Sequence, residues 1–221
     1  AVINLALSEF GLSIMNPFSS VYFDQSIGVK RRLSIKLEDI KRIQKDCYKA
    51  NDEKRWLIAL IADTGMRLAE GAGLLRTDFT RQDGVLCVTI RPHRWRSLKT
   101  KSSARVIPLI GSAKWAAEQI LDQIFESTFA FPTYNYKKRT NANSASASLN
   151  KWLKGRIGQT FSIHSFRHSM RDRLREVDCP SEVIDQIGGW ARSGVGDSYG
   201  EGYSLFKMHN YLEKITFSLY G

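Results

Sequence analysis

The chain has 221 residues, of which 33 are Lys or Arg and 22 are Asp or Glu, so its formal net charge at pH 7 is +11. Hydrophobic residues make up 43% of the sequence and aromatic residues 11%, which favours a folded domain with a sizeable core and excludes general disorder. No apolar run approaches the roughly 20 residues that a membrane-spanning helix needs. Three well-separated cysteines, an odd number, favour a reducing compartment over a disulfide scaffold. We therefore expect a cytoplasmic protein whose charge favours nucleic acid or another anionic partner.

The N-terminal stretch differs from the rest of the chain. Residues 1–14 read as the end of a helix, and the Asn16-Pro17 pair that follows is a turn signal. The sequence is then polar and reads as extended to about residue 33. We interpret residues 1–33 as the tail of an absent N-terminal domain plus a linker, and residues 34–221 as one domain.

Helical patterns dominate the next part of the chain. After Ser34, apolar residues at positions 40, 43 and 47 fall on one face of a helix. A second helix, over residues 53–62, is apolar on most sides and is expected to be buried. It stops at the sequence Asp63-Thr64-Gly65, and a short helix is expected from about residue 67 to residue 75.

The middle of the chain changes to a strand pattern. Segments 84–90 and 103–110 are rich in β-branched residues, and we expect two strands joined by a basic hairpin. The polar segment 133–148 is expected to form an exposed loop that enters a helix near Leu149. Further helices are expected over residues 112–125, over 164–176 and 181–187 with Ser162 and Ser181 as N-caps, and over 204–218. The predicted fold class is α+β, mainly helical with one small antiparallel sheet.

Positive charge is concentrated in two runs, residues 91–105 and 137–156, that contain no acidic residue. One such run alone is as readily explained by a solvated face. Two runs in one domain favour contacts with the DNA backbone, because Lys and Arg bind it by displacing condensed counterions. The DNA contacts are expected to come from Arg91, Arg94, Arg96, Lys101, Arg105, Lys137, Lys138 and Arg139.

Two motifs place a basic side chain where it could belong to a catalytic site. In TGMRLAEGAGL, residues 64–74, Arg67 stands at the start of a helix, where it either pairs with Glu70 one turn on or belongs to a site. The second motif is LKTKSSARVIPL, in which Lys99 lies on the predicted hairpin. By itself, a hairpin lysine is usually only a solvated charge.

Two further motifs lie toward the C-terminus. In HSFRH, residues 164–168, His164 and Arg167 lie three residues apart on one helix face and can converge on one phosphate. His164 and His168 also have the spacing of a helical metal pair, but no third ligand is evident nearby, so we favour the phosphate interpretation. In IGGWARSGVGDSYGEGY, residues 187–203, Trp190 precedes a glycine-rich loop that carries Tyr199.

Taken together, the four motifs resemble the signature of the tyrosine site-specific recombinases, the phage integrase family. The resemblance covers roughly residues 34–215 in the family's order, with Tyr199 nine residues after Trp190. The segment SEFGLSIMNPF also resembles the junction between that family's core-binding and catalytic domains. The resemblance therefore implies an integrase catalytic domain.

The resemblance gives each motif residue an expected role. Tyr199 would attack a scissile phosphodiester, form a 3′-phosphotyrosyl link and release a 5′-hydroxyl. A tyrosine with a pKa near 10 is a poor nucleophile at neutral pH and needs help with its proton. The implied roles of the others are phosphate binding for Arg67, Arg167 and Trp190, proton acceptance for His164, proton donation for Lys99, and support for Glu70 and His168.

The resemblance also implies partners and leaves alternatives open. It implies no metal or cofactor, double-stranded DNA attachment sites, and a homotetramer on DNA joined through the C-terminal helix, although that helix could equally fold back on its own domain. It implies a bacterial or phage-encoded protein of a prophage or other mobile element. Lys101 could replace Lys99, and Tyr203 could replace Tyr199. The functional alternatives are an inactive DNA-binding protein of the same fold and a type IB-like topoisomerase.

Overall fold

The computed structural model describes residues 2–19, 21, 33–124, 127–136, 139–191 and 202–217. The chain divides into two units, residues 1–31 and residues 32–221, which are described separately. In the first unit, helix α1 (Val2–Glu9) ends short of the expected residue 14 and buries no side chain. The Asn16 side chain accepts a hydrogen bond from the backbone N–H of Phe18 at 2.9 Å, which forms the turn expected at this point.

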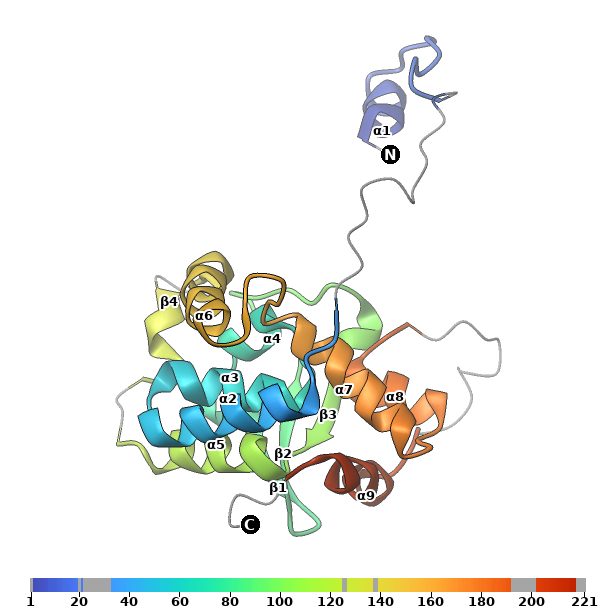
Figure 1. The fold of residues 1–221 in the computed structure, drawn as a ribbon. Coiled ribbons are helices and arrows are strands. Elements are labelled where there is room, and N and C mark those ends of the chain that lie inside the picture. Colours follow the sequence, from blue (N-terminus) through green and yellow to red (C-terminus); the bar gives the residue numbers. More distant parts are fainter. Residues whose placement is uncertain are drawn as a thin grey trace. The chain divides into compact units, whose positions relative to one another are not determined.

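The second unit is mainly helical and carries a small sheet, as predicted (Figure 1). Helix α3 is buried from Trp56 onward and packs most extensively against α5, with α2 and α7 as further neighbours. The helices are α2 (Leu37–Ala50), α3 (Glu53–Thr64), α4 (Leu68–Ala72), α5 (Gly111–Asp122), α6 (Ala142–Ile157), α7 (Ser165–Glu176), α8 (Ser181–Gly188) and α9 (Leu205–Ile215).

The sheet has three antiparallel strands in the order β1-β2-β3. The two predicted strands are β2 (Val85–Ile90) and β3 (Arg105–Pro108), and they pair with each other as expected. Strand β1 (Phe79–Gln82) was not predicted, because its sequence FTRQ is too polar to read as a strand. It pairs with β2 through a tight turn at Asp83-Gly84, where both residues have positive φ (49° and 80°). An Asp-Gly pair is a strong signal for this kind of hairpin turn.

The segment before α6 is more ordered than the sequence predicted. Two short strands, β4 (Asn135–Tyr136) and β5 (Arg139–Thr140), pair in antiparallel fashion. Helix α6 then begins at Ala142, so the expectation of a loop extending to residue 148 is wrong. The side chain of Asn141 accepts a hydrogen bond from the backbone N–H of Ser144 at 3.0 Å, and this cap starts the helix inside the polar sequence.

The two predicted serine N-caps are also wrong. Helix α7 has His164 at its N-cap position, and Ser162 lies before the helix, where its carbonyl accepts a hydrogen bond from Ser165 at 2.8 Å. Helix α8 has Pro180 at its N-cap, so that Ser181 is the first helical residue. In both cases the chain turns beside the expected serine without using its hydroxyl as the cap.

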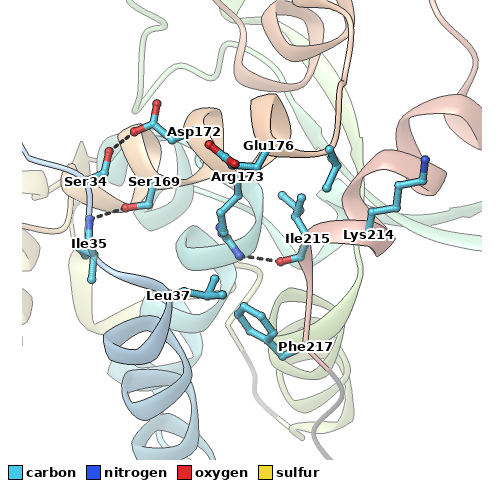
Figure 2. A pocket seen from close by; sticks show the side chains of 11 residues that line it. Ser34, Ile35, Leu37, Ser169, Asp172, Arg173, Glu176, Lys214, Ile215 and Phe217 are labelled. Carbon is cyan, nitrogen blue, oxygen red and sulfur yellow. Dashed lines mark hydrogen bonds between the residues drawn. The ribbon is translucent and has the colours of Figure 1, made fainter.

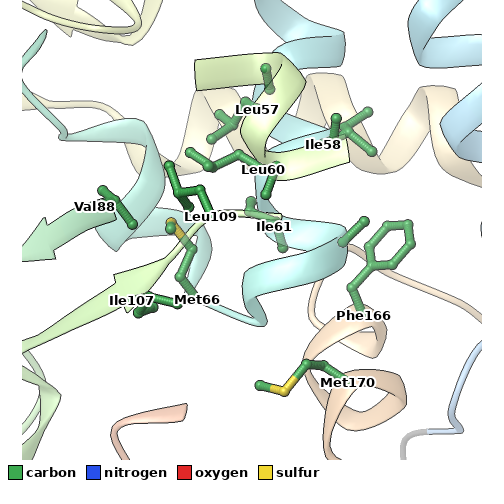
Figure 3. Packing of buried hydrophobic residues seen from close by; sticks show 14 of the residues in the cluster. Leu57, Ile58, Leu60, Ile61, Met66, Val88, Ile107, Leu109, Phe166 and Met170 are labelled. Atoms are coloured by element: carbon green, nitrogen blue, oxygen red, sulfur yellow. The ribbon is translucent and has the colours of Figure 1, made fainter. Parts of the chain in front are cut away.

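The core lies where α3, the sheet and α7 meet (Figure 3). Leu57, Leu60 and Ile61 extend from α3 toward side chains of the strands and of the segment that follows β3. Phe166 and Met170 close the core from α7. Among the described helices, none is both long and apolar enough to cross a membrane.

Helix α9 packs on β3 and α7 of its own domain, and it buries Met208, Leu212 and Ile215. The Ile215 carbonyl accepts a hydrogen bond from Arg173 of α7 at 3.0 Å. Beside this contact lies a cavity of about 300 Å³, drawn in Figure 2, whose lining includes Leu37 and Phe217. Of the two arrangements that the sequence left open for the C-terminal helix, the chain shows the one in which it folds back.

Candidate active site

The first motif forms the turn between α3 and α4. Gly65 ends α3 with φ at 60°, and a Cβ at this position would collide with the Met170 side chain. Arg67 follows as the N-cap of α4, and its backbone N–H donates to the carboxylate of Glu70 at 2.9 Å. Its guanidinium donates to the other oxygen of the same carboxylate at 2.6 Å. Arg67 therefore does pair with Glu70, and the question is whether it also belongs to a larger site.

Glu70 is shared by two arginines from different elements. Arg105, the first residue of β3, donates to its carboxylate at 3.0 Å, and both side chains are almost fully buried. Burial alone would raise the pKa of Glu70, but the charge of Arg105 and the hydrogen bonds from Arg67 and Arg105 outweigh it, so the pKa is lowered. Arg105 also donates to the Ser103 carbonyl at 2.6 Å and to the Ile187 carbonyl at 2.7 Å. It thereby ties α4 to the hairpin and to the end of α8.

Arg167 is a buried cation with no carboxylate within ion-pair distance among the described residues. Its side chain belongs to α7, the residue is 3% exposed, and Nη1 donates to the Gly65 carbonyl at 2.8 Å. Its Nη2 has no hydrogen-bond acceptor in the described part of the chain. Burial first, and then the charges of Arg67 and Arg105, lower the pKa of Arg167 to about 9. A phosphate oxygen would supply both the missing acceptor and the missing negative charge.

The Gly-Gly-Trp segment, residues 188–190, contacts both Arg67 and Arg167. The Trp190 ring covers the guanidinium of Arg167, with 4.0 Å between the guanidinium carbon and the ring centroid. One residue earlier, the Gly189 carbonyl accepts a long hydrogen bond of 3.5 Å from Nη2 of Arg67. A Cβ at Gly188 would lie only 1.7 Å from the Trp190 ring, so this position requires glycine. The structure therefore brings Arg67, Arg167 and Trp190 together, as the phosphate interpretation requires.

The two histidines of the third motif lie at the start of α7. His164 is the N-cap residue and His168 lies one turn further on, with 5.3 Å between the ring centroids in an edge-to-face arrangement. Both rings are partly buried. In the described part of the chain, no three His, Cys, Asp or Glu residues are grouped so that they could hold a metal ion.

The predicted general acid lies on the segment that joins β2 to β3. Lys99 and Lys101 are both exposed, and they flank Thr100. The hydroxyls of Thr100 and Ser103 share a hydrogen bond at 2.9 Å, and Ser103 in turn accepts one from Nη1 of Arg67 at 2.9 Å. The lysine segment is thus attached to the arginine cluster, but the choice between Lys99 and Lys101 stays open.

The residues expected to bind DNA fall into three groups. Arg91, Arg94 and Arg139 are exposed, and Arg91 forms an ion pair with Asp78 at 2.8 Å. Lys101 is exposed as well, while Lys137 and Lys138 lie outside the described residues.

Arg96 and Arg105 differ from this expectation because their side chains are buried. Arg96 donates to the carbonyls of Glu70 and Arg91 at 3.0 and 2.8 Å, and the Arg105 guanidinium is held inside the cluster described above. We therefore assign neither to the DNA-contacting surface. The two basic runs do meet, because the backbone N–H of Thr140 donates to the Trp95 carbonyl at 3.3 Å.

The predicted nucleophile, Tyr199, lies outside the described residues. The alternative, Tyr203, is described and is fixed to α8 through its backbone. Its N–H donates to the side chain of Gln186 at 2.8 Å, and its carbonyl accepts from the same side chain at 2.9 Å. Its ring packs against the core and lies under the ammonium of Lys207.

The sequence did not predict the residues that contact Arg67 and Trp190 from outside the motifs' expected site. Ser103 gave no signal, because a single serine in a polar hairpin is unremarkable until Arg67 is seen to bind it. Arg105 was assigned to DNA contact, although strand alternation puts it on the same face as the buried Ile107. Arg171 was also missed; its guanidinium lies 4.7 Å from the Trp190 ring centroid, on α7, and it pairs with Asp185 at 3.3 Å.

Comparison with known proteins identifies the family. Residues 34–201 match the phage integrase family. The chain belongs to this family. The resemblance seen in the sequence is therefore confirmed, whereas no match is found among curated proteins.

Solved structures show the same fold. XerA recombinase has a TM-score of 0.55 and 13% identity, with 99% of this chain and 70% of that chain covered. XerH bound to difH in a pre-cleavage complex has a TM-score of 0.57 and 17% identity, covering 95% and 59%. The Tn1549 transposon integrase in complex with circular intermediate DNA has a TM-score of 0.57 and 16% identity, covering 88% and 74%. The predicted α+β fold of a recombinase catalytic domain is thereby confirmed.

Proposed function

We propose that this integrase-family chain cleaves and rejoins double-stranded DNA at specific sites through a covalent 3′-phosphotyrosine. Membership of the family and a fold shared with DNA-bound recombinases support DNA recombination in general. The observation that carries the proposal is Arg167, a buried cation with an unused donor, stacked on Trp190 and close to Arg67. A buried cation without a counter-charge is costly, so such a site is matched to an anionic ligand. Phosphodiester oxygens fit both its charge and its donors.

The reaction balances with the groups present in this chain. The Tyr199 hydroxyl attacks the scissile phosphorus, and the new bond from the tyrosine oxygen to phosphorus replaces the bond from phosphorus to the 5′ oxygen. The tyrosine proton passes to His164, and Lys99 donates a proton to the departing 5′ oxygen. Arg67 and Arg167 hold the non-bridging oxygens and stabilise the charge that grows on them. Rejoining is the same step in reverse, with a 5′-hydroxyl as the nucleophile.

Two structural features support Tyr199 over Tyr203. The backbone of Tyr203 is held on both sides by Gln186, and its ring packs against the core. A tyrosine fixed in this way would have to leave its packing to reach a phosphate beside Arg167. Strand exchange between two duplexes needs several copies of the chain, so a homotetramer on DNA is part of the proposal, although α9 is packed on its own domain here.

The test uses the full-length product of the gene and nicked duplexes tiled across the DNA that flanks the gene. A nick next to the cleavage point lets a short fragment diffuse away, which traps the covalent adduct on a denaturing gel. The proposal predicts an adduct, with the DNA remnant on Tyr199 by mass spectrometry. Tyr199→Phe abolishes the adduct, and the matched variant Tyr203→Phe retains it.

Other outcomes would redirect the assignment. An adduct that survives Tyr199→Phe and disappears in Tyr203→Phe would move the nucleophile to Tyr203. Salt-sensitive binding without an adduct on any tiled duplex would favour an inactive DNA-binding protein. Relaxation of supercoiled plasmid without site preference would favour a type IB-like topoisomerase.

A further inference from the structure

The segment that carries the candidate general acids is attached to Arg67 and Arg105 through two groups of one residue, Ser103. Ser103 is fully buried, and its hydroxyl accepts a hydrogen bond from Arg67 at 2.9 Å. Its carbonyl accepts one from Arg105 at 2.6 Å. Both arginines also bind Glu70, so Ser103 is held by a pair of cations whose own geometry is fixed. This residue is therefore a rigid anchor beside the phosphate-binding side chains.

A second hydroxyl, that of Thr100, connects the exposed part of the segment to Ser103. Thr100 shares a hydrogen bond with the Ser103 hydroxyl at 2.9 Å, and its carbonyl accepts one from the Ser103 backbone N–H at 3.1 Å. Thr100 lies between Lys99 and Lys101, both exposed. The described contacts of Thr100 thus link the lysines to Arg67 through two side-chain oxygens.

We propose that Thr100, acting through Ser103, is a positioning residue for the general acid. The two hydroxyls couple the lysine segment to Arg67, so that the proton donor is held at a fixed position relative to the phosphate-binding arginine. The proposal rests on the cleavage reaction proposed above. Thr100 contacts neither DNA phosphate nor the nucleophile in this scheme. Its effect is on the place of the lysine ammonium relative to the departing 5′ oxygen.

The physical reason is the sensitivity of proton transfer to geometry. A donor must come within about 3 Å of the atom that it protonates. A long, exposed lysine on an unanchored segment would meet that condition only part of the time. Misplacing a reacting group by about 1 Å can cost on the order of 100-fold in rate, so we expect a loss of about 10- to 100-fold when the coupling is removed.

The experiment replaces the departing 5′ oxygen with sulfur in the nicked duplex that gives the wild-type adduct. A thiol has a pKa near 8.5, far below that of an alcohol, so the sulfur leaves as a thiolate without a proton donor. Thr100→Val keeps the shape of the side chain and removes the hydroxyl. On normal DNA we expect adduct formation to slow by about 10- to 100-fold. On sulfur-substituted DNA we expect the rate to return to within a few fold of wild type.

Control variants separate a positioning role from a structural one. Lys99→Ala and Lys101→Ala identify the general acid, because sulfur restores only the variant that lacks the proton donor. Thr100→Ser keeps the hydroxyl and is expected to retain wild-type rates on both DNAs. Ser102→Ala removes an exposed hydroxyl that also bonds Thr100, at 3.0 Å, but does not contact Arg67, and it too is expected to retain them. Thermal melts check that each variant is folded.

The experiment distinguishes failure of the positioning role from failure of the proposed cleavage reaction. If wild type forms no adduct on either DNA, the cleavage reaction and the positioning role fall together. If wild type and the lysine variants behave as expected but Thr100→Val matches wild type on normal DNA, the reaction stands and the positioning role is overturned. A Thr100→Val defect that persists on sulfur-substituted DNA would also overturn it, because the fault would then lie in phosphate binding or folding.

Discussion

Two charge clusters lie at the two ends of the Asp63–Arg67 stretch, and they use similar residues in different ways. In one, Asp63 accepts hydrogen bonds from Gln44, Ser112 and Arg173, and the single cation faces a single anion. Arg173 also donates to the carbonyls of Ala62 and Ile215, so this cluster fastens α3, α7 and α9 together.

The other cluster is not balanced. Arg67 and Arg105 share the one carboxylate of Glu70, while Arg167 has no ion-pair partner and keeps a donor unused among the described residues. Buried charge is tolerated when it is paired, and an unpaired excess is normally selected against for stability alone. The comparison teaches that the balanced cluster serves the fold, and we propose that the excess of positive charge in the other makes it an anion-binding site.

The largest expected effect comes from removing the unpaired cation. Arg167→Gln is expected to slow adduct formation by about 1000-fold, because a charged donor to the transition state is lost. The same variant is expected to be no less stable than wild type, since it removes a buried charge that has no ion-pair partner. Adduct gels and urea unfolding measure the two effects. Normal cleavage by this variant would remove Arg167 from the site.

The opposite pattern is expected at the balanced cluster. Asp63→Asn leaves Arg173 buried without its carboxylate and is expected to lower the free energy of unfolding by about 3 kcal/mol. The rate of adduct formation per folded molecule is expected to stay within a few fold of wild type at a temperature where the variant is folded. A stable variant that has lost cleavage would show that the two clusters are not separate in function.

Inorganic phosphate offers a test that needs no DNA. If the excess charge binds an anion, phosphate at ten times its dissociation constant stabilises the folded state by about 1.4 kcal/mol. For a domain of this size that is a rise of a few degrees in the melting temperature. The effect is expected to be absent in Arg167→Gln, which serves as the control for general salt effects. An equal rise in both proteins would place the anion elsewhere.

The smallest expected effect is on the pH dependence of stability. The pKa of Arg167 is lowered to about 9 by burial and by its arginine neighbours, so the folded state releases this proton before the unfolded state does. The charged form therefore costs stability below pH 9, and the cost is relieved as the pH rises through that value. Wild type is expected to gain stability relative to Arg167→Gln between about pH 8 and 10. A flat difference across this range would contradict the lowered pKa.

The sequence predicted the parts of the site that belong to local motifs. Arg67 and Glu70 share one helical turn, and His164 and Arg167 share another, so their relation follows from helix geometry. The mainly helical fold was predicted from helical periodicity, and the pairing of β2 with β3 from two segments rich in β-branched residues that a hairpin joins. The Gly-Gly-Trp motif also agrees with the position of Trp190 over Arg167, because the Trp190 ring leaves no room for a side chain at Gly188.

What the sequence could not predict depends on contacts between distant residues. Ser103 has a role only because Arg67, in another element, donates to it. Arg105 was read as a surface charge because its partners, Glu70 and the Ile187 carbonyl, come from two other parts of the chain. Strand β1 was missed because its pairing with β2, rather than its own composition, makes it a strand.

The most direct test of the central claim changes the charge of the phosphate itself. A neutral methylphosphonate at the scissile position of the nicked duplex removes the negative charge that the excess arginine is proposed to match. We predict that wild type and Arg167→Gln form the adduct on this DNA at similar rates, although they differ by about 1000-fold on normal DNA. If Arg167→Gln remains as defective on the neutral DNA as on the charged one, Arg167 does not act on the phosphate charge, and the anion-binding role proposed for this cluster is wrong.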